Sequence, residues 1–176
     1  MWFVLEVSRR GCNLPLSRED LEMVIAELPS VAGIPLDIVE LRLKRRDSAW
    51  TQMVVAAHAA GAVTEPDVVL AALAHRERLG STGIGKGCVL AGIRSLAVVR
   101  PRIVLGRTTR GIEWGAADEA PVTLAVLLLS PSTQSADAHL DQLARLSQAL
   151  RLQRSRQKLA EAPLALAAVL LEGRTG

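Results

Sequence analysis

The chain has 176 residues, 49% of them hydrophobic, and a formal net charge of +3. This length suits one domain with a substantial core. The longest apolar runs, residues 122–129 and 164–171, are far shorter than the ~20 residues that cross a bilayer. The start of the chain lacks the basic region of a secretory signal. These features argue against a membrane span and an export signal, and we expect a cytoplasmic protein.

Cysteines and basic residues also narrow the function classes. Cys12 and Cys88 form no CxxC pair, so neither a disulfide framework nor a zinc site is predicted. The densest basic cluster, RLKRR at residues 42–46, could contact nucleic acid or an acidic lipid. Only 2% of the residues are aromatic, however, and stacking on bases needs aromatic side chains. We therefore favour a solvated junction, and expect no nucleic-acid partner, metal or cofactor.

The N-terminal part predicts a helix followed by an extended segment. Ser17, with an acid three residues later, marks the start of a helix over residues 18–28. Proline and glycine then interrupt the chain, and residues 37–43 alternate loosely as in a strand. We treat residues 1–35 as an extension of unknown role packed on a main domain of residues 36–176.

Two helices are expected next. Asp47 or Ser48 can cap a helix that runs to about Ala60. Pro66 occupies the first turn of a second helix, which reaches about Leu79.

From residue 88 the pattern becomes strand-like. Residues 88–93 form a short apolar run between glycines. Residues 96–105 predict an interrupted or edge strand, because Pro101 lies inside the run and proline cannot donate to a sheet. Residues 122–129 are almost continuously apolar, which is typical of a central strand covered on both faces.

The C-terminal part returns to helices. Leucines at helical spacing predict a helix over residues 137–152. A last helix over residues 156–171 should be kinked or split at Pro163. Helices, then strands, then helices indicate a layered α/β or α+β domain.

The most specific pattern begins at Arg76 and Glu77. STGIGKG follows at residues 81–87, and then a short apolar run that ends in Ala91-Gly92. This order resembles the active-site segment of the enzyme IIA domains of the bacterial phosphotransferase system, of the mannitol/fructose and nitrogen-regulatory type.

Further matches extend the resemblance over about residues 36 to 172. Residues 112–114, IEW, precede the central strand, and residues 139–144 read HLDQLA, both in the family's order and at its spacing. The resemblance implies an α/β three-layer sandwich in which helices flank a mixed β-sheet.

The resemblance also assigns roles to residues. In this family the histidine of a strand-end Pro-His pair accepts the phosphoryl group, a second histidine lies beside it, and the arginine of Arg-Glu helps to hold the phosphate. Here Gly92 stands at the acceptor position, while His139 and Arg76 keep the supporting positions. Phosphoryl transfer to a histidine suits these residue types, because imidazole is a good nucleophile near neutral pH and a cation neutralises phosphoryl oxygens. Gly92 has no side chain with which to accept anything.

Other residues could take over as acceptor. On a strand, Cys88 would share a face with Gly92 but lie roughly 13 Å away, and a small buried cysteine is the commoner interpretation. His139 would be close, yet we favour a structural role for it, either bonding a loop carbonyl or packing at a helix N-terminus. His58 and His75 are most simply surface or half-buried helix residues.

The glycine run has two interpretations. Its glycines allow positive φ and close packing before a strand without any ligand. Alternatively, backbone N–H groups with Arg76, Lys86 and Arg94 could form an anion-binding concavity. We favour the structural role, because the run leads into a strand and lacks the Gly-Lys-Ser/Thr of a P-loop.

Three functions remain open. The first is an enzyme IIA-like regulatory or protein-binding module that has lost the usual phosphohistidine and binds phosphotransferase-system components, a transporter or a regulator. The second is an active phosphocarrier that uses His139. The third is a sensor of anions or phosphorylated metabolites.

Overall fold

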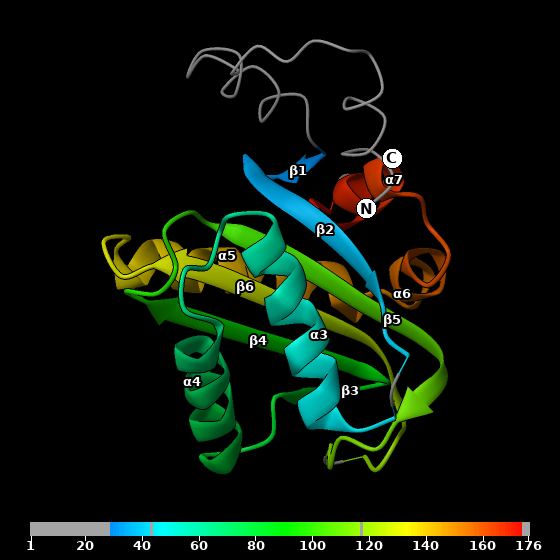
Figure 1. Cartoon of the computed structure of the whole chain (residues 1–176). Helices are drawn as coiled ribbons and strands as arrows, with labels where there is room; N and C mark the ends of the chain where they lie inside the picture. The colour runs from blue at the N-terminus through cyan, green and yellow to red at the C-terminus, as the bar shows by residue number, and fades with distance from the viewer. Residues whose placement is uncertain (1–28, 43, 117, 174–176) are drawn as a thin grey trace, which may run out of the picture.

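The computed structural model describes residues 29–42, 44–116 and 118–173, and Figure 1 shows a single sheet with helices on both sides. The six strands are arranged in the order β1-β2-β5-β6-β4-β3. They are β1 (Ser30–Val31), β2 (Ile34–Glu40), β3 (Gly83–Gly85), β4 (Cys88–Ser95), β5 (Arg102–Ile112) and β6 (Val122–Pro131).

The sheet is mixed. β2 runs parallel to β5, and β6 runs parallel to β4, whereas the β5–β6 pair and both edge pairs are antiparallel. The described helices are α3 (Arg46–Ala59), α4 (Pro66–Arg78), α5 (Ala136–Arg151), α6 (Gln153–Leu159) and α7 (Leu164–Leu171).

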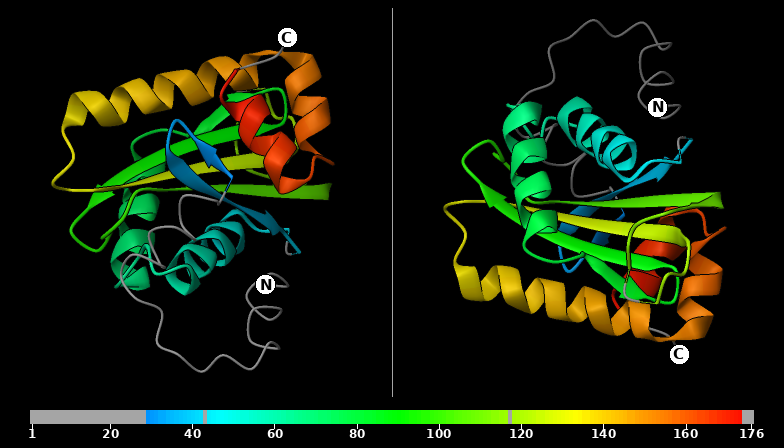
Figure 2. Two further views of the ribbon diagram at one scale, coloured as in Figure 1. Left: turned by 90° about the horizontal axis from the view of Figure 1, so that it is seen from above. Right: turned by 90° about the horizontal axis from the view of Figure 1, so that it is seen from below.

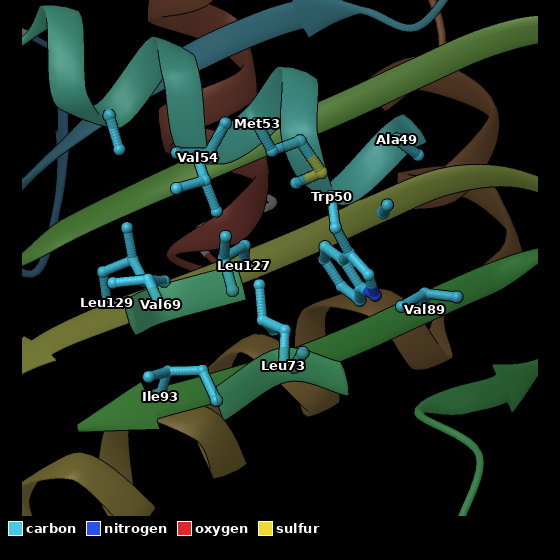
Figure 3. Packing of buried hydrophobic residues seen from close by; sticks show 14 of the residues in the cluster. Ala49, Trp50, Met53, Val54, Val69, Leu73, Val89, Ile93, Leu127 and Leu129 are labelled. Atoms are coloured by element: carbon cyan, nitrogen blue, oxygen red, sulfur yellow. The ribbon is translucent and has the colours of Figure 1, made fainter. Parts of the chain in front are cut away.

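An apolar cluster lies on each side of the sheet, between the strands and the helices that cover them. α3 and α4 cover one face, and α5, α6 and α7 cover the other, as the two views of Figure 2 show. Figure 3 shows Trp50 and Met53 of α3 facing the sheet, with Leu73 of α4 beside them. The predicted three-layer α/β sandwich is confirmed.

The position of β6 in the sheet explains why its sequence is almost entirely apolar. Alternate residues belong to the two clusters, so both faces of the strand are buried: Ala125, Leu127 and Leu129 on one side, and Leu124, Val126 and Leu128 on the other. A strand with no solvent face has no polar alternation, and the prediction of a central strand is confirmed.

The prediction for residues 96–105 is wrong in its position. The strand begins only at Arg102 and extends to Ile112, and β2 and β6 flank it on both sides. Pro101 precedes the strand, so its missing N–H interrupts no ladder. The proline marks where β5 starts and does not place it at an edge.

Other boundaries differ in detail. β2 covers Ile34–Glu40 instead of residues 37–43, so the expected domain boundary at residue 36 falls inside a strand. The N-cap of α3 is Arg45, without a side-chain cap, and Asp47 lies in the first turn, where its charge favours the helix dipole. The last helix is split at Pro163, as predicted. The helix predicted over residues 18–28 lies outside the described residues.

Candidate functional site

Gly92 lies near the end of β4 on the face that α5 covers. Val89, Ala91 and Ile93 of this strand belong to the cluster under α3 and α4, so the alternate position 92 faces the other way. A Cβ atom added at Gly92 would lie 2.7 Å from Nε2 of His139 and 2.7 Å from Cδ1 of Leu143. Both side chains come from α5. The space for a strand-end side chain is therefore filled by the helix.

His139 is held in place rather than presented to solvent. Its side chain is buried, and Nδ1 lies 2.8 Å from Oγ of Ser130, a fully buried residue near the end of β6. Burial, and then the positive charge of Arg94, lower the pKa of His139 below its usual value. The imidazole is therefore neutral at neutral pH and packs between β4, β6 and its own helix.

Arg94 fixes the loop that leads into α5. Its Nη2 donates to the carbonyl of Ser132 at 3.1 Å and to that of Gln134 at 2.7 Å. One residue further on, Ser135 caps α5 by accepting from the N–H of Ala138. Arg94 thus orders the start of the helix that carries His139.

Arg76 and Glu77 do different work at the other end of the motif. Nη1 of Arg76 donates to the carbonyl of Gly80, in the turn just after α4. Glu77 is buried, and its carboxylate accepts from N of Thr82 at 3.1 Å and from Oγ1 of Thr82 at 2.6 Å. Nε1 of Trp114 in turn donates to Thr82 Oγ1 at 3.2 Å. We call Glu77, Thr82 and Trp114 the buried clasp.

The glycine run forms a tight hairpin. Lys86 and Gly87, the two residues between β3 and β4, have φ of +57° and +71°, and positive φ at both loop residues is what a type I′ turn requires. The N–H of Lys86 donates to Oδ2 of Asp118 at 2.6 Å, and this bond lowers the pKa of Asp118. An anion at this turn would therefore meet a carboxylate.

The three cations of the suggested anion site are not brought together. Lys86 precedes β4 and Arg94 lies at its far end, eight residues later, which corresponds to more than ~20 Å along a strand. Arg76 belongs to α4, which covers the face opposite His139. Arg76, Lys86 and Arg94 therefore do not converge on one anion pocket.

The remaining candidates have structural surroundings. Cys88 is buried, and burial raises the pKa of its thiol to about 11, so the nucleophilic thiolate is scarce at neutral pH. His58 and His75 lie on exposed helix surfaces. In the described ranges no group of three His, Cys, Asp or Glu side chains could hold a metal ion.

Sequence reasoning missed two residues at Gly92. Leu143 is one of the leucines whose spacing predicts the helix, and its Cδ1 lies 2.7 Å from the Cβ position at Gly92. Ser130, the hydrogen-bond partner of His139, carries one signal: it is the polar residue that ends the apolar run of β6.

The fold is a mixed sheet between two helical layers, with a strand end at Gly92 that faces His139 of α5. Residues 37–168 match the family described as "Phosphoenolpyruvate-dependent sugar phosphotransferase system, EIIA 2". The chain belongs to this family.

Relatives point the same way. The fructose-specific EIIA component of Haloferax volcanii is 30% identical over 140 residues, which are 80% of this chain and 90% of that protein. The fructose-specific EIIABC component of Bacillus subtilis is also 30% identical over 140 residues, but the chain spans only 21% of its length.

Solved structures support the fold. The nitrogen regulatory protein IIA-Ntr of Neisseria meningitidis superimposes with a TM-score of 0.69 at 23% identity, covering 77% of this chain and 95% of that one. The enzyme IIA-mannitol of Escherichia coli, solved in complex with phosphorylated enzyme IIB-mannitol, gives 0.62 at 19% identity over 78% and 94%.

Among the described residues, the helices are too short or too polar to span a bilayer.

Proposed function

We propose that this chain is an enzyme IIA-like regulatory module that acts by binding a protein partner and carries no phosphoryl group at the strand-end position. The observation behind this is the packing at Gly92. Nε2 of His139 and Cδ1 of Leu143 occupy the space that a side chain at residue 92 would need, each 2.7 Å from the Cβ position. Residue 92 thus has no acceptor side chain, and the side chains of His139 and Leu143 occupy the space that one would need.

The surroundings of His139 argue against its taking over as acceptor. One ring nitrogen is engaged with Ser130, and the other points at Gly92 beneath Leu143. A phosphoryl group arriving at Nε2 would have to displace Leu143 and enter a space where Gly92 and Leu143 are half-buried. Placing charged oxygens there without partners is costly. Arg94, the nearest cation, already donates to two carbonyl groups.

A protein partner fits the family. The enzyme IIA-mannitol structure was solved with a phosphorylated protein, enzyme IIB-mannitol. We propose that this chain likewise binds a protein in the cytoplasm, either a phosphotransferase-system component or a transporter or regulator. A recognition module needs only the retained fold and surface, not the acceptor.

A phosphotransfer assay tests the proposal. The purified chain is incubated with labelled phosphoenolpyruvate, the general phosphotransferase enzymes and the phosphocarrier protein, with an active enzyme IIA as positive control. We expect no stable label on this chain. Label on the wild-type chain that disappears in His139→Ala would establish the phosphocarrier alternative instead.

A gain-of-function variant, compared with a matched control, tests the same proposal from the other side. Ala91→Pro with Gly92→His restores the family's Pro-His pair, and Leu143→Ala in the same chain makes room for it. Label on this triple variant but not on Leu143→Ala alone would show that the scaffold still presents a strand-end histidine. Equal label on the wild type would overturn the proposal.

A further inference from the structure

The sheet has an open edge along the second half of β4. β3 is the outermost strand on this side, and it pairs only with Cys88 and Val89. One more bond follows, from N of Leu90 to the carbonyl of Thr82 at 3.1 Å. On the other side of β4, β6 pairs with all eight residues of the strand. In Figure 1 β3 accordingly lies beside the start of β4, and within the described ranges no strand lies beside its arrowhead end.

Backbone groups of Gly92 and Arg94 face this open edge. The N–H and C=O groups of a strand alternate between its two sides. N of Leu90 points to the β3 side, so those of Gly92 and Arg94 point the same way. The carbonyl of Ser95 fits this alternation, because it accepts from N of Ser132, which follows β6. No described backbone group bonds to Gly92 or to N of Arg94 from the open side. Two N–H groups and the carbonyl of Gly92 are therefore available to another strand.

Apolar side chains are exposed beside this edge. Cδ1 of Leu143 on α5 lies 2.7 Å from the Cβ position of Gly92, and Leu140 lies three residues earlier on the same side of the helix. Leu140 is 60% exposed, and Leu96, which follows β4 closely, is 87% exposed. A strand added beside residues 92–94 would lie next to α5, so its side chains on that face can pack against Leu140.

Positive charge lies at both ends of the open edge. Arg94 lies at the far end and is exposed. Arg76 is exposed too, and its Nη1 donates to the carbonyl of Gly80, two residues before Thr82, where bonding on this side of β4 stops. Pairing with a second copy through residues 92–94 would set the arginines of two chains against each other, and like charges across a strand pair are destabilising. A strand that carries acids suits this edge better.

We propose that the open edge of β4 binds an extended segment of a partner protein, which joins the sheet as a further strand beside residues 92–94. Main-chain hydrogen bonds to Gly92 and Arg94 supply the affinity. An apolar residue against Leu140 and an acid towards Arg76 supply the specificity. This inference rests on the proposed protein-binding function and names the kind of partner that it needs.

Amide hydrogen exchange of the free, full-length chain tests whether the edge is open. The N–H groups of Ala91 and Ile93 face β6, whereas those of Gly92 and Arg94 face the open side. We expect the Gly92 and Arg94 amides to exchange about tenfold faster, or more, than those of Ala91 and Ile93. Equal protection at all four positions would mean that the edge is already covered, and would overturn the proposal.

A selected peptide then tests docking. Random peptides of strand length, displayed on phage, are selected against the full-length chain, and the tightest binder is synthesised. We expect an acidic peptide with alternating apolar residues, which slows hydrogen exchange at Gly92 and Arg94. A selection that yields no binder, or a binder that protects only amides elsewhere, would count against the edge as a docking site.

Matched controls separate strand pairing from non-specific binding. Two methylated copies of the peptide carry N-methyl groups on alternate residues, so each copy loses the N–H groups of one side only. One copy should lose binding and the other should keep it. In the chain, Leu140→Glu should weaken peptide binding by about tenfold or more, whereas Val55→Glu, the same kind of change at an exposed position of α3, should not. Equal binding of both methylated copies, or an unchanged affinity in Leu140→Glu, would refute the proposal.

A concentration series distinguishes a partner from a second copy. We expect exchange at Gly92 and Arg94 in the chain alone to be independent of its concentration. Protection that rises with concentration would mean that a second copy supplies the strand, which contradicts the proposal. Failure of peptide binding would leave the result of the phosphotransfer assay unchanged, whereas label on the wild-type chain would overturn the proposed function with the edge still open.

Discussion

The two ends of the motif segment, the buried clasp and Gly92, differ in their polar contacts. At the buried clasp Thr82 and Trp114 both use their polar groups in hydrogen bonds, and Glu77 also pairs with Arg46 of α3 at 3.7 Å. Gly92 has no side chain, and His139 and Leu143 of α5 occupy the space where one would lie. The buried clasp joins the end of α4 to the glycine run and Trp114, whereas the Gly92 end is where our proposal places the loss of the acceptor. If that proposal holds, the motif identifies the fold and not the reaction.

If the clasp is structural, breaking it should have the largest effect on stability. Glu77→Ala removes the acceptor of two bonds from Thr82, leaving buried donors unpaired. We expect the free energy of unfolding to fall by about 2–3 kcal/mol, measured by urea denaturation.

Glu77→Gln is the conservative control, because it keeps one carbonyl acceptor and should lose clearly less. Asp141→Ala, at an exposed position of α5, should change little. Equal losses for Glu77→Ala and Asp141→Ala would mean that the clasp contributes nothing.

At the other end, adding a single carbon should cost less. Gly92→Ala brings Cβ to within 3.0 Å of Nε2 of His139 and Cδ1 of Leu143, so these side-chain ends must shift. Overpacking costs about 1–3 kcal/mol, and we expect the lower half of that range because side-chain ends can move where backbone cannot. Urea denaturation measures the loss, and Leu143→Ala in the same chain should recover part of it.

A double-mutant cycle makes the recovery quantitative, because residues in contact show non-additive effects. Gly92→Ala and Leu143→Ala should couple, whereas Gly92→Ala and Val55→Ala, on the other side of the sheet, should add. Strict additivity for the first pair would show that the space at residue 92 is open.

Removing the partner of His139 should have a smaller effect. Ser130→Ala deletes the 2.8 Å bond to Nδ1 and should cost about 1 kcal/mol. In NMR spectra the imidazole signals of His139 should also change, since the bond no longer fixes the ring. Unchanged ring signals would mean that packing alone positions the histidine.

The fold was largely predictable because burial leaves a direct mark on composition. A run such as residues 122–129 with no polar alternation fits a strand covered on both faces, and Pro163 splits a helix wherever it occurs. Placing β5 at an edge failed because composition shows that a proline is present but not on which side of a strand boundary it lies.

The candidate site was predictable only in part. Gly92 and His139 could be found from the motif, but the contact between β4 and α5 joins distant parts of the chain, and nothing local encodes it. The partners of Arg94 are backbone carbonyls. Every residue type supplies a carbonyl, so no sequence pattern distinguishes a cation that orders a loop from one that awaits an anion.

The smallest expected effect is a pH dependence that belongs to the Gly92 end alone. Burial and the charge of Arg94 lower the pKa of His139 in the folded state, so between that value and the unfolded value of about 6.5 the unfolded chain binds more protons. Stability is then complete above the unfolded pKa and declines as the pH falls through this window. Comparing urea midpoints at neutral and mildly acidic pH, we expect the decline to be smaller in His139→Gln, which cannot titrate. The control is His75→Gln, the same substitution at an exposed helix position. A wild-type decline that persists in His139→Gln would assign it to other groups and would mean that His139 is less enclosed than its packing against Gly92 implies.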